Sequence, residues 1–570
     1  MLPPGICFLL SGAPRLTVRT LTLALAYHAS QMLLLVGYDL KLPNWLKAVL
    51  LFLSLLLTAA VNVIWSNMQN KRDARSLGAV LPPAVKGNWP GNIDTLFSAL
   101  NNEKTAYTAD IITHRSKELG WTFNWRLFWE DKILTSEPEL IKAGDHFKDL
   151  MRSVLGSGAF NSDGEMWKYH RSMTRPFFSK DRVLHVEVFK RHADEAIELM
   201  KVRLREGHAI DFQDLMSRFT MDSATEFLFG HCGSSLSSSS LPYPPNAAPG
   251  DLHGNNAPSL FSEAFAEAQL LLIRRTRYYS LWPLFEFWED KTQKHMKVIN
   301  AFIEPMLQEA IKKKKEYMKT GSYRENDIEQ GDTLLSHLIN ITKDMKVLKD
   351  EILNIMIAGK DTTAAVLTFA IYCLAMHPEI LKRLREEILT VIGSERSPTS
   401  DDMKEMKYLR AVINETLRLY PPVPFNQRAS INATTLPNKT PGSKPWYIPA
   451  QTNQRIRPDR FLDARLHTYL APNPFIFLPF NAGPRICLGQ QFAYNEVSFM
   501  LIRLLQAFDA VALAPDAQAP ETRPPAAWAR ETGSRKSRER VWLKSHLTMY
   551  VHGGLWVCLR EAAPSGTASI

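Results

Sequence analysis

The distribution of apolar and polar residues divides the chain into an apolar N-terminal part, a helical middle and a C-terminal part of short segments. Between about residue 93 and residue 420, apolar residues recur mainly at the spacing of amphipathic helices, and alternating runs are few. Beyond residue 420 the segments shorten and prolines separate them, and SHLTMYV (545–551) is typical of a strand. We therefore expect a mainly α fold with a small β component, in one large domain over residues 93–570.

One stretch interrupts the helical middle. Residues 233–258 read GSSLSSSSLPYPPNAAPGDLHGNNAP, which is polar and rich in serine, proline and glycine. Such a composition predicts an irregular surface loop.

Near the N-terminus, twenty almost continuously apolar residues, Leu46–Trp65, read LKAVLLFLSLLLTAAVNVIW. As a helix rising about 1.5 Å per residue, this length crosses the hydrocarbon core of a bilayer. Trp45 and Trp65 bracket the span as interfacial anchors, and Lys47 can extend its ammonium group to the interface. We predict a transmembrane helix over residues 46–65, preceded by an N-terminal segment, residues 1–45.

Basic residues follow this span directly, at Lys71, Arg72 and Arg75. Basic flanks remain on the cytosolic side, so the domain that follows is expected to face the cytosol. Residues 66–92 form this flank and a proline-marked hinge that ends in LPPAVKGNWPGN. An earlier apolar stretch, Leu21–Val36, contains polar residues and is either a second span or an interfacial helix.

The net charge of +10 on 570 residues is a modest basic excess. It fits an anionic membrane surface or an acidic protein partner. The sequence has no basic stripe interleaved with aromatic residues and no recognition-helix pattern, so we expect no nucleic-acid partner. We interpret the basic run Lys312–Lys315 as a solvated helix face.

Five cysteines lie far apart and form no Cys-x-x-Cys pair: Cys7, Cys232, Cys373, Cys487 and Cys558. An odd number at such spacing fits neither a disulfide framework nor a zinc site. The main body of the chain is therefore expected to be reduced, as in the cytosol.

Cys487 differs from the other four because of its surroundings, FLPFNAGPRICLGQQF. These contain Phe-x-x-Gly-x-Arg-x-Cys-x-Gly, a match expected by chance on the order of once in ten thousand chains of this length. If Cys487 ligates an iron, Gly483 and Gly489 let the backbone turn tightly and aim amide groups at the sulfur. The apolar run that follows predicts a helix whose positive end favours a thiolate.

This motif resembles the haem-binding loop of the cytochrome P450 family, and the resemblance spans nearly the entire chain. It implies that the Cys487 thiolate is the proximal ligand of haem b. It also implies that Arg485 faces a haem carboxylate and that Phe480 packs against the flat face of the cofactor. Trp167 and Arg171, in GEMWKYHRSMTRPFF, match the family's Trp-x-x-x-Arg spacing near a haem propionate, and Arg428 is a further propionate candidate.

A polar group, AGKDTT (358–363), interrupts a long apolar helical stretch that ends at Pro378. Thr362 can bond back to the carbonyl of Ala358, four residues earlier, which loosens the helix beside a ligand, and Gly359 removes a side chain there. The group is similar to the family's oxygen-activation motif, which implies that Asp361 and Thr362 deliver protons.

Two further segments match a structural network of the family. INETLRLYPPVPFNQR contains Glu415 and Arg418 on one helix face, and PDRF (458–461) contains Arg460. The resemblance implies that these three residues form a buried network that fixes the region before the cysteine loop, with a structural rather than a catalytic role.

The chain departs from the family pattern between Pro449 and Pro458. Only residues 450–457 lie there, whereas the family normally has a strand and a short helix. Typical strands have about 5–6 residues and typical helices about 11. We therefore expect an internal deletion, with the sheet beside the haem losing a strand.

The resemblance implies a haem-thiolate monooxygenase that inserts one atom of O2 into an apolar substrate. It looks most like the fungal membrane-bound enzymes that hydroxylate alkanes and fatty acids, in the endoplasmic reticulum membrane with NADPH-cytochrome P450 reductase as electron donor. Four residues are expected to flank the substrate pocket: Ile355, Met356, Val423 and Phe425. Two alternatives stay open: a haem-thiolate isomerase or dehydratase, and an inactive membrane-tethered chain that does not retain haem.

Overall fold

The structure of this protein is a computed structural model, and it describes most of the chain with several gaps. The described residues are 3–8, 43–107, 110–120, 122–135, 145–178, 186–230, 232–237, 240–247, 257–319, 333–424, 426–429, 433–436, 442–448, 453–456, 477–531 and 534–563. The expected second apolar segment, Leu21–Val36, lies outside them. So do Phe425 and Arg460, while Arg428 is described by its backbone alone.

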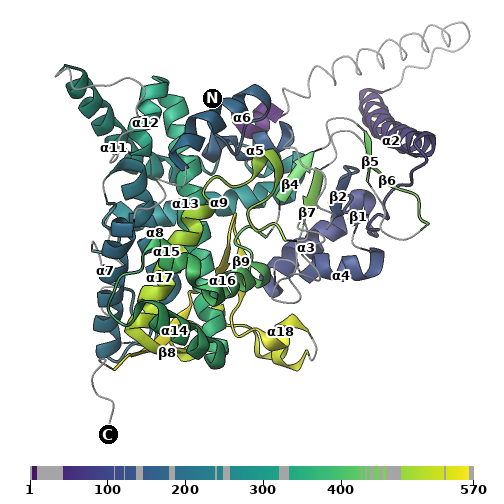
Figure 1. The fold of residues 1–570 in the computed structure, drawn as a ribbon. Coiled ribbons are helices and arrows are strands. Elements are labelled where there is room, and N and C mark those ends of the chain that lie inside the picture. Colours follow the sequence, from purple (N-terminus) through teal and green to yellow (C-terminus); the bar gives the residue numbers. More distant parts are fainter. Residues whose placement is uncertain are drawn as a thin grey trace, which may run out of the picture.

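The fold is mainly helical, as predicted, and helix α13 (Met345–Met376) runs through its centre (Figure 1). The Asp344 side chain caps the helix start by accepting hydrogen bonds from the backbone N–H groups of Lys346 and Val347. Pro378 begins the next helix, α14 (Pro378–Ile392), because a proline without an N–H group suits a first helical position. Among the described helices, α13 is long and apolar enough to cross a bilayer, but 72% of its most apolar window is buried, so it is a core helix.

The helices with the most extensive contacts to α13 are α8 (Phe212–Phe229), α16 (Lys407–Leu419) and α17 (Gln490–Ala507). Helix α8 starts at Asp211, whose side chain accepts from Gln213 N and Asp214 N, and it ends at Gly230, which adopts a φ of 73°. The main core lies between these helices.

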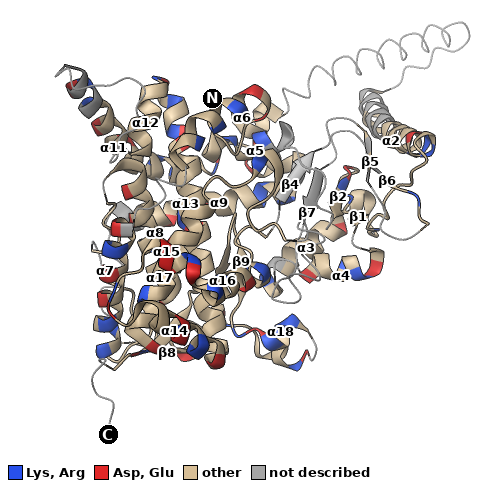
Figure 2. Cartoon of the chain, in the orientation of Figure 1, with Lys and Arg blue, Asp and Glu red and all other residues tan. Residues whose placement is uncertain are grey.

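The remaining helices surround this centre. They are α3 (Ile93–Thr105), α4 (Asp110–Leu119), α5 (Asp145–Leu155), α6 (Gly164–Thr174), α7 (Val186–Arg205), α9 (Ala257–Tyr278), α10 (Trp282–Phe285), α11 (Gln293–Lys319), α12 (Leu334–Ile341), α15 (Ser400–Glu405) and α18 (Arg535–Arg538). Basic and acidic residues are interspersed over the helices in the view of Figure 2. The loop between α8 and α9 has no helix or strand in its described part, as expected from its composition, but it does not lie wholly on the surface, because Leu236 and Leu241 are buried in the main core.

The β component consists of small sheets. One has the strand order β1–β2–β7–β4, with β1 (Thr122–Asn124), β2 (Lys132–Thr135), β7 (Asn453–Ile456) and β4 (Asn426–Ala429). Another joins β3 (Ile210–Asp211), β11 (Trp556–Glu561) and β8 (Phe508–Leu513), and β5 (Thr434–Leu436) pairs with β6 (Trp446–Ile448).

Two expectations about strands are wrong. Strand β7 lies within the shortened segment and pairs with both β2 and β4, so the sheet keeps a strand there. Four residues suffice because each strand residue rises about 3.3 Å. Residues 545–551 form two strands instead of one, since β9 (Leu543–Ser545) and β10 (Met549–Val551) pair in antiparallel and the chain reverses at residues 546–548.

The predicted span Leu46–Trp65 lies within helix α2 (Asn44–Ser76), which continues through the basic flank. Bulky apolar side chains on this helix are exposed, among them Phe52 at 61% and Leu57 at 66%. After α2 the chain returns to the domain, where Val80 N donates to Pro445 O at 2.8 Å beside β6. Figure 1 shows α2 standing apart from the central helices, next to β5 and β6.

Candidate functional site

The cysteine loop is a tight turn placed directly before helix α17. Its 3-10 turn, Gly483–Arg485, requires glycine because Gly483 has a φ of 72°. The backbone N–H of Cys487 donates to the carbonyl of Phe480 at 2.9 Å, which closes the loop on itself. Gly489 has a φ of −82°, which any residue can adopt, so the expected turn role applies to Gly483 and not to Gly489.

The sulfur of Cys487 opens into a large cavity and is otherwise surrounded by protein. Burial raises the pKa of the Cys487 thiol, whereas the N–H of Gly489 and the charge of Arg171 act in the opposite direction. Helix α17 begins three residues later at Gln490, so its positive end faces the same region. The Gly489 N–H, Arg171 and the positive end of α17 therefore favour a thiolate once a cation binds to the sulfur.

Two arginines and an indole lie beside the cysteine loop. Arg171, on α6, donates to the carbonyl of Ile486 at 2.9 Å. Arg485 donates to Asp163 Oδ1 at 2.6 Å, and its guanidinium carbon lies 4.7 Å from the ring centroid of Trp167. Burial lowers the pKa of both arginines, though neither loses its charge near neutral pH. The rim is therefore positive and suits a carboxylate-bearing ligand.

Phe480 lies on the cavity wall, and its ring centroid is 5.0 Å from that of Tyr494 on α17. Tyr494 is held in turn by Asn414, which accepts its hydroxyl hydrogen at 2.7 Å. Residues of α16 and α17 thus hold the aromatic surface beside the cysteine in place.

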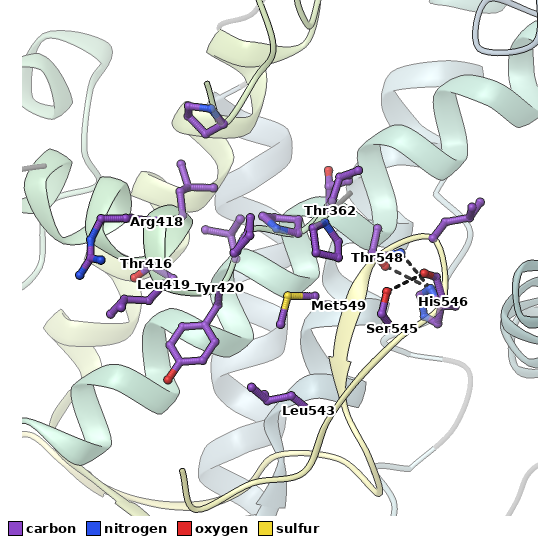
Figure 3. A pocket seen from close by; sticks show the side chains of 18 of the residues that line it. Thr362, Thr416, Arg418, Leu419, Tyr420, Leu543, Ser545, His546, Thr548 and Met549 are labelled. Atoms are coloured by element: carbon purple, nitrogen blue, oxygen red, sulfur yellow. Dashed lines mark hydrogen bonds between the residues drawn. The ribbon is translucent and has the colours of Figure 1, made fainter. Parts of the chain in front are cut away.

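Thr362 lies on α13 at the cavity, where Gly359 and Ala358 also line the wall. Its hydroxyl donates to the carbonyl of Ala358 at 2.5 Å, as expected from the four-residue spacing. A methyl group at Gly359 would meet the Ala224 side chain at 3.8 Å, an ordinary contact. Figure 3 shows Thr362 close to the β9–β10 hairpin, which carries His546.

Asp361 does not lie on the cavity wall, although its neighbour Thr362 does. Its carboxylate accepts from Lys360 Nζ at 2.8 Å and from Gln269 Nε2, on α9, at 2.6 Å. Burial alone would raise the pKa of Asp361, but Lys360, His546 and the hydrogen bond from Gln269 together lower it. Asp361 is therefore held ionised by Lys360, which belongs to the motif, and by Gln269, which does not.

Glu415 and Arg418 form a bidentate ion pair on α16, one turn apart. Arg418 Nε donates to Glu415 Oε2 at 2.7 Å, and a second bond joins Arg418 Nη2 to Glu415 Oε1. Both residues line the cavity and retain partial solvent exposure. Their expected third partner, Arg460, lies outside the described residues.

The cavity has a volume of about 2240 Å³, far larger than the roughly 300–1,000 Å³ of an ordinary ligand pocket. It reaches from Cys487 across α13 to the β9–β10 hairpin, so it has room for a large flat cofactor and a separate substrate. Ile355 and Val423 line it, as expected. Met356 does not: successive helix residues point about 100° apart, and Met356 is fully buried in the core.

A polar cluster that no sequence motif indicates also lines the cavity. Glu539 accepts from the hydroxyl groups of Tyr372 and Tyr420, each at 2.9 Å, and from Arg535 Nε at 2.7 Å. These residues come from α13, the end of α16 and the α18 region. A buried carboxylate with three donors fixes the C-terminal segment against the helices.

Burial lowers the pKa of His546 to about 4, so its ring is neutral near pH 7. The Thr548 backbone N–H donates to His546 Nδ1 at 3.2 Å across the hairpin tip (Figure 3). The alternating pattern of 545–551 could not show this turn, since it reads as one continuous strand.

Comparisons with known proteins agree with this geometry. The family described as cytochrome P450 matches residues 90–453 and 454–532, and these two stretches meet within the shortened segment. "Cytochrome P450 52A6" of Candida tropicalis is 35% identical over 81% of this chain and 92% of its own length. "Cytochrome P450 monooxygenase pvhE" of Talaromyces variabilis is 31% identical over 81% of this chain and 89% of its own length.

Members of this family bind haem b through an axial cysteine thiolate. The donor set here fits that group, because a thiol opens into a cavity with aromatic and cationic side chains around it. The family model and the relatives agree with the core helix and the cysteine loop. This chain therefore belongs to the cytochrome P450 family of monooxygenases.

Proposed function

We propose that this cytochrome P450 holds haem through Cys487 and hydroxylates apolar substrates of the long-chain alkane or fatty-acid class. The reaction converts R–H, O2, two electrons and two protons to R–OH and water. Haem, when bound, supplies the oxygen-activating chemistry, while the protein positions the substrate and moves protons. Electrons come from a separate NADPH-cytochrome P450 reductase.

The observation that carries the proposal is the position of Cys487. It is the thiol on the wall of the large cavity that directly precedes the N-terminus of α17, with Gly489 N–H and Arg171 favouring its charged form. The cationic rim formed by Arg171 and Arg485 suits the two carboxylates of haem, and Trp167 packs beside Arg485. Arg428 is a further carboxylate partner in this proposal.

Thr362 is the residue proposed to pass protons into the cavity. Its hydroxyl is on the wall, and the buried carboxylate of Asp361 is the next residue on the helix. Asp361 is ionised and turned toward Lys360 and Gln269, so in this arrangement it can accept a proton but has none to donate.

The proposed substrate class rests on the cavity and on the relatives. Ile355 and Val423 give the wall an apolar surface, and the volume left beside a cofactor accommodates a long chain. The resemblance to fungal alkane and fatty-acid hydroxylases supports the same class.

We propose that α2 anchors the protein in the endoplasmic reticulum membrane with residues 93–570 in the cytosol. Exposed apolar side chains along α2 favour lipid over water, and the basic residues at its end remain on the cytosolic side. A substrate dissolved in the bilayer would then reach the cavity from the membrane side.

A carbon-monoxide difference spectrum of the reduced protein tests the haem assignment. We expect a haem-thiolate band in membranes that contain the full chain and the Cys558→Ser control, and no band with Cys487→Ser. Cys558 is exposed and does not line the cavity, so it controls for the loss of any thiol. A wild-type chain without the band would instead support the inactive alternative.

Turnover with NADPH, reductase and a long-chain fatty acid or alkane tests the reaction. We expect one atom of labelled O2 in the hydroxylated product. The isomerase or dehydratase alternative would be supported by two results together. The protein would convert a peroxide substrate in the absence of NADPH, and it would form no hydroxylated product in the presence of NADPH.

A further inference from the structure

A second cluster of metal-binding side chains lies away from the haem cavity, where α7, α8 and the loop after α8 meet. His192 on α7, Asp222 on α8 and Cys232 in the loop each offer a ligand atom, and these three atoms lie within 4.8 Å of one another. None of the three residues lines the large cavity. The cluster is therefore separate from the proposed haem site.

His192 is presented like a metal ligand. Its side chain is buried, and Nε2 is paired with Glu226 Oε2 at 2.8 Å. Its other ring nitrogen, Nδ1, is buried and has no hydrogen-bond partner in the described part of the chain. A carboxylate on one ring nitrogen fixes the tautomer that leaves a lone pair on the other, which is the usual arrangement behind a zinc-bound histidine.

Asp222 is held in place by backbone groups of the loop. Its two oxygens accept from Ser235 N at 2.7 Å and from Leu236 N at 2.9 Å. Each oxygen keeps a further lone pair, since a carboxylate can accept about four hydrogen bonds. A ligand carboxylate that is already oriented by second-sphere donors is typical of metal sites.

Cys232 supplies the third donor from the start of the loop. Its sulfur accepts the backbone N–H of Ser234 at 3.2 Å. Glu195, one turn along α7 from His192, places Oε2 4.0 Å from His192 Nδ1, which is too long for a hydrogen bond. This carboxylate is near enough to become a fourth ligand, and a water molecule could take the same position.

We infer that His192, Asp222 and Cys232, with Glu195 or water as the fourth ligand, form a structural zinc site that fastens the loop after α8 to α7 and α8. Nitrogen, sulfur and oxygen donors together suit zinc, which takes four ligands in a tetrahedron. Zinc–ligand bonds of about 2.0–2.3 Å put tetrahedral ligand atoms roughly 3.5 Å apart, so the site closes by about 1 Å on binding.

The cysteine spacing alone predicts no zinc site, because a single cysteine contributes here. Asp222 and Cys232 are ten residues apart, but His192 comes from another helix. The fold, and not a sequence motif, brings the third ligand to the other two.

Zinc content of the detergent-solubilised full chain tests the inference. After equilibration with buffered free Zn²⁺, zinc and iron are counted separately by mass spectrometry. We expect about one zinc ion per chain in the wild type and at least a tenfold loss of affinity in Cys232→Ser and His192→Gln. Cys558→Ser and His377→Gln, which change exposed residues, are the matched controls and are expected to bind zinc as the wild type does.

Thermal unfolding gives a second readout. Zinc is expected to raise the unfolding temperature of the wild type and of both controls, but not of Cys232→Ser, because a ligand that binds the folded state stabilises it. Circular dichroism of each variant shows that it has retained its fold. The inference is overturned if the wild type binds no zinc, or if folded Cys232→Ser binds it with unchanged affinity.

Discussion

The guanidinium of Arg171 donates a hydrogen bond to the carbonyl of Ile486, the residue directly before Cys487. Arg171 also favours the charged form of the thiol. One side chain from α6 thus fixes the backbone of the cysteine loop and adjusts its electrostatics. It couples a helix in the first third of the chain to a loop near the C-terminus.

Arg171→Gln is expected to reduce haem retention several-fold without unfolding the protein. The change removes a charge-assisted hydrogen bond, worth about 1.5–3 kcal/mol in general and less at this partly exposed site. The ratio of haem absorbance to protein measures the effect. Arg175→Gln, at an exposed position one turn further along the chain, is the matched control. Equal haem content in the two variants would argue against the role of Arg171.

Thr362→Val is expected to lower product formed per NADPH consumed at least tenfold, because general acid–base groups contribute about 10²–10⁴-fold. Haem content should stay unchanged, since Thr362 is not part of the cysteine loop. Product yield and NADPH consumption, measured together, show the loss. Thr368→Val is the control: Thr368 makes the same type of bond, to Ala364 O at 2.7 Å, and is absent from the cavity lining. Similar yields from both variants would contradict the proposal.

Glu415→Gln is expected to destabilise the fold by about 1–3 kcal/mol, because Arg418 loses its bidentate partner. The loss is smaller than for a fully buried pair because water screens both groups. Chemical unfolding monitored by circular dichroism measures it. Asp401→Asn breaks an exposed pair with Lys404 and is expected to change stability by less than about 1 kcal/mol. If the two variants are equally stable, Glu415 is not a structural anchor.

Glu496 gives a prediction about pH. Burial raises its pKa from 4.5 to about 8, with the hydroxyl groups of Ser223 and Thr363 acting in the opposite direction. The folded state therefore keeps a proton that the unfolded state loses. As the pH rises from about 4.5 to about 8, the contribution of Glu496 to the unfolding free energy falls, by on the order of 5 kcal/mol.

Glu496→Gln removes this contribution, so the variant should gain stability relative to the wild type between pH 5 and about pH 8. Thermal melts over that range measure the difference. Glu405→Gln, at an exposed position, should follow the wild type at every pH. A difference in unfolding temperature between Glu496→Gln and the wild type that stays the same at every pH in this range would contradict the raised pKa of Glu496.

Leu57→Arg is expected to shift the protein from the membrane fraction toward the soluble fraction. Leu57 is exposed on α2 near the middle of the proposed span, where an arginine costs about 2.5–3.5 kcal/mol on insertion. Fractionation with alkaline washing measures the distribution. Ser66→Arg, just beyond Trp65, should leave the protein in the membrane.

The site was predictable from the sequence where its chemistry is local. The cysteine loop, the Thr362–Ala358 bond and the Glu415–Arg418 pair all depend on residues within a few positions of one another. The direction of the Asp361 side chain was not predictable, because it is set by Gln269, ninety-two residues earlier in the chain. Met356 was misjudged because a stretch that is apolar on all sides of a helix does not show which side faces the cavity.

The fold was likewise predictable where it depends on residues close together in the sequence. The helical periodicity predicted the central helices, whose apolar faces repeat over many residues. Strand β7 was missed because its pairing with β2 depends on a partner more than three hundred residues away. The hairpin tip at residues 546–548 was missed because it contains no glycine or proline to mark the turn.

A hydroxyl group has a single hydrogen, and that of Thr362 is engaged by the Ala358 carbonyl. In this resting arrangement the oxygen can only receive hydrogens from the cavity. Donation into the cavity needs a rotation about the Cβ–Oγ bond or the Cα–Cβ bond that breaks the hydrogen bond to Ala358. If Thr362 passes protons into the cavity as proposed, its hydrogen bond to the main chain must therefore break before each transfer.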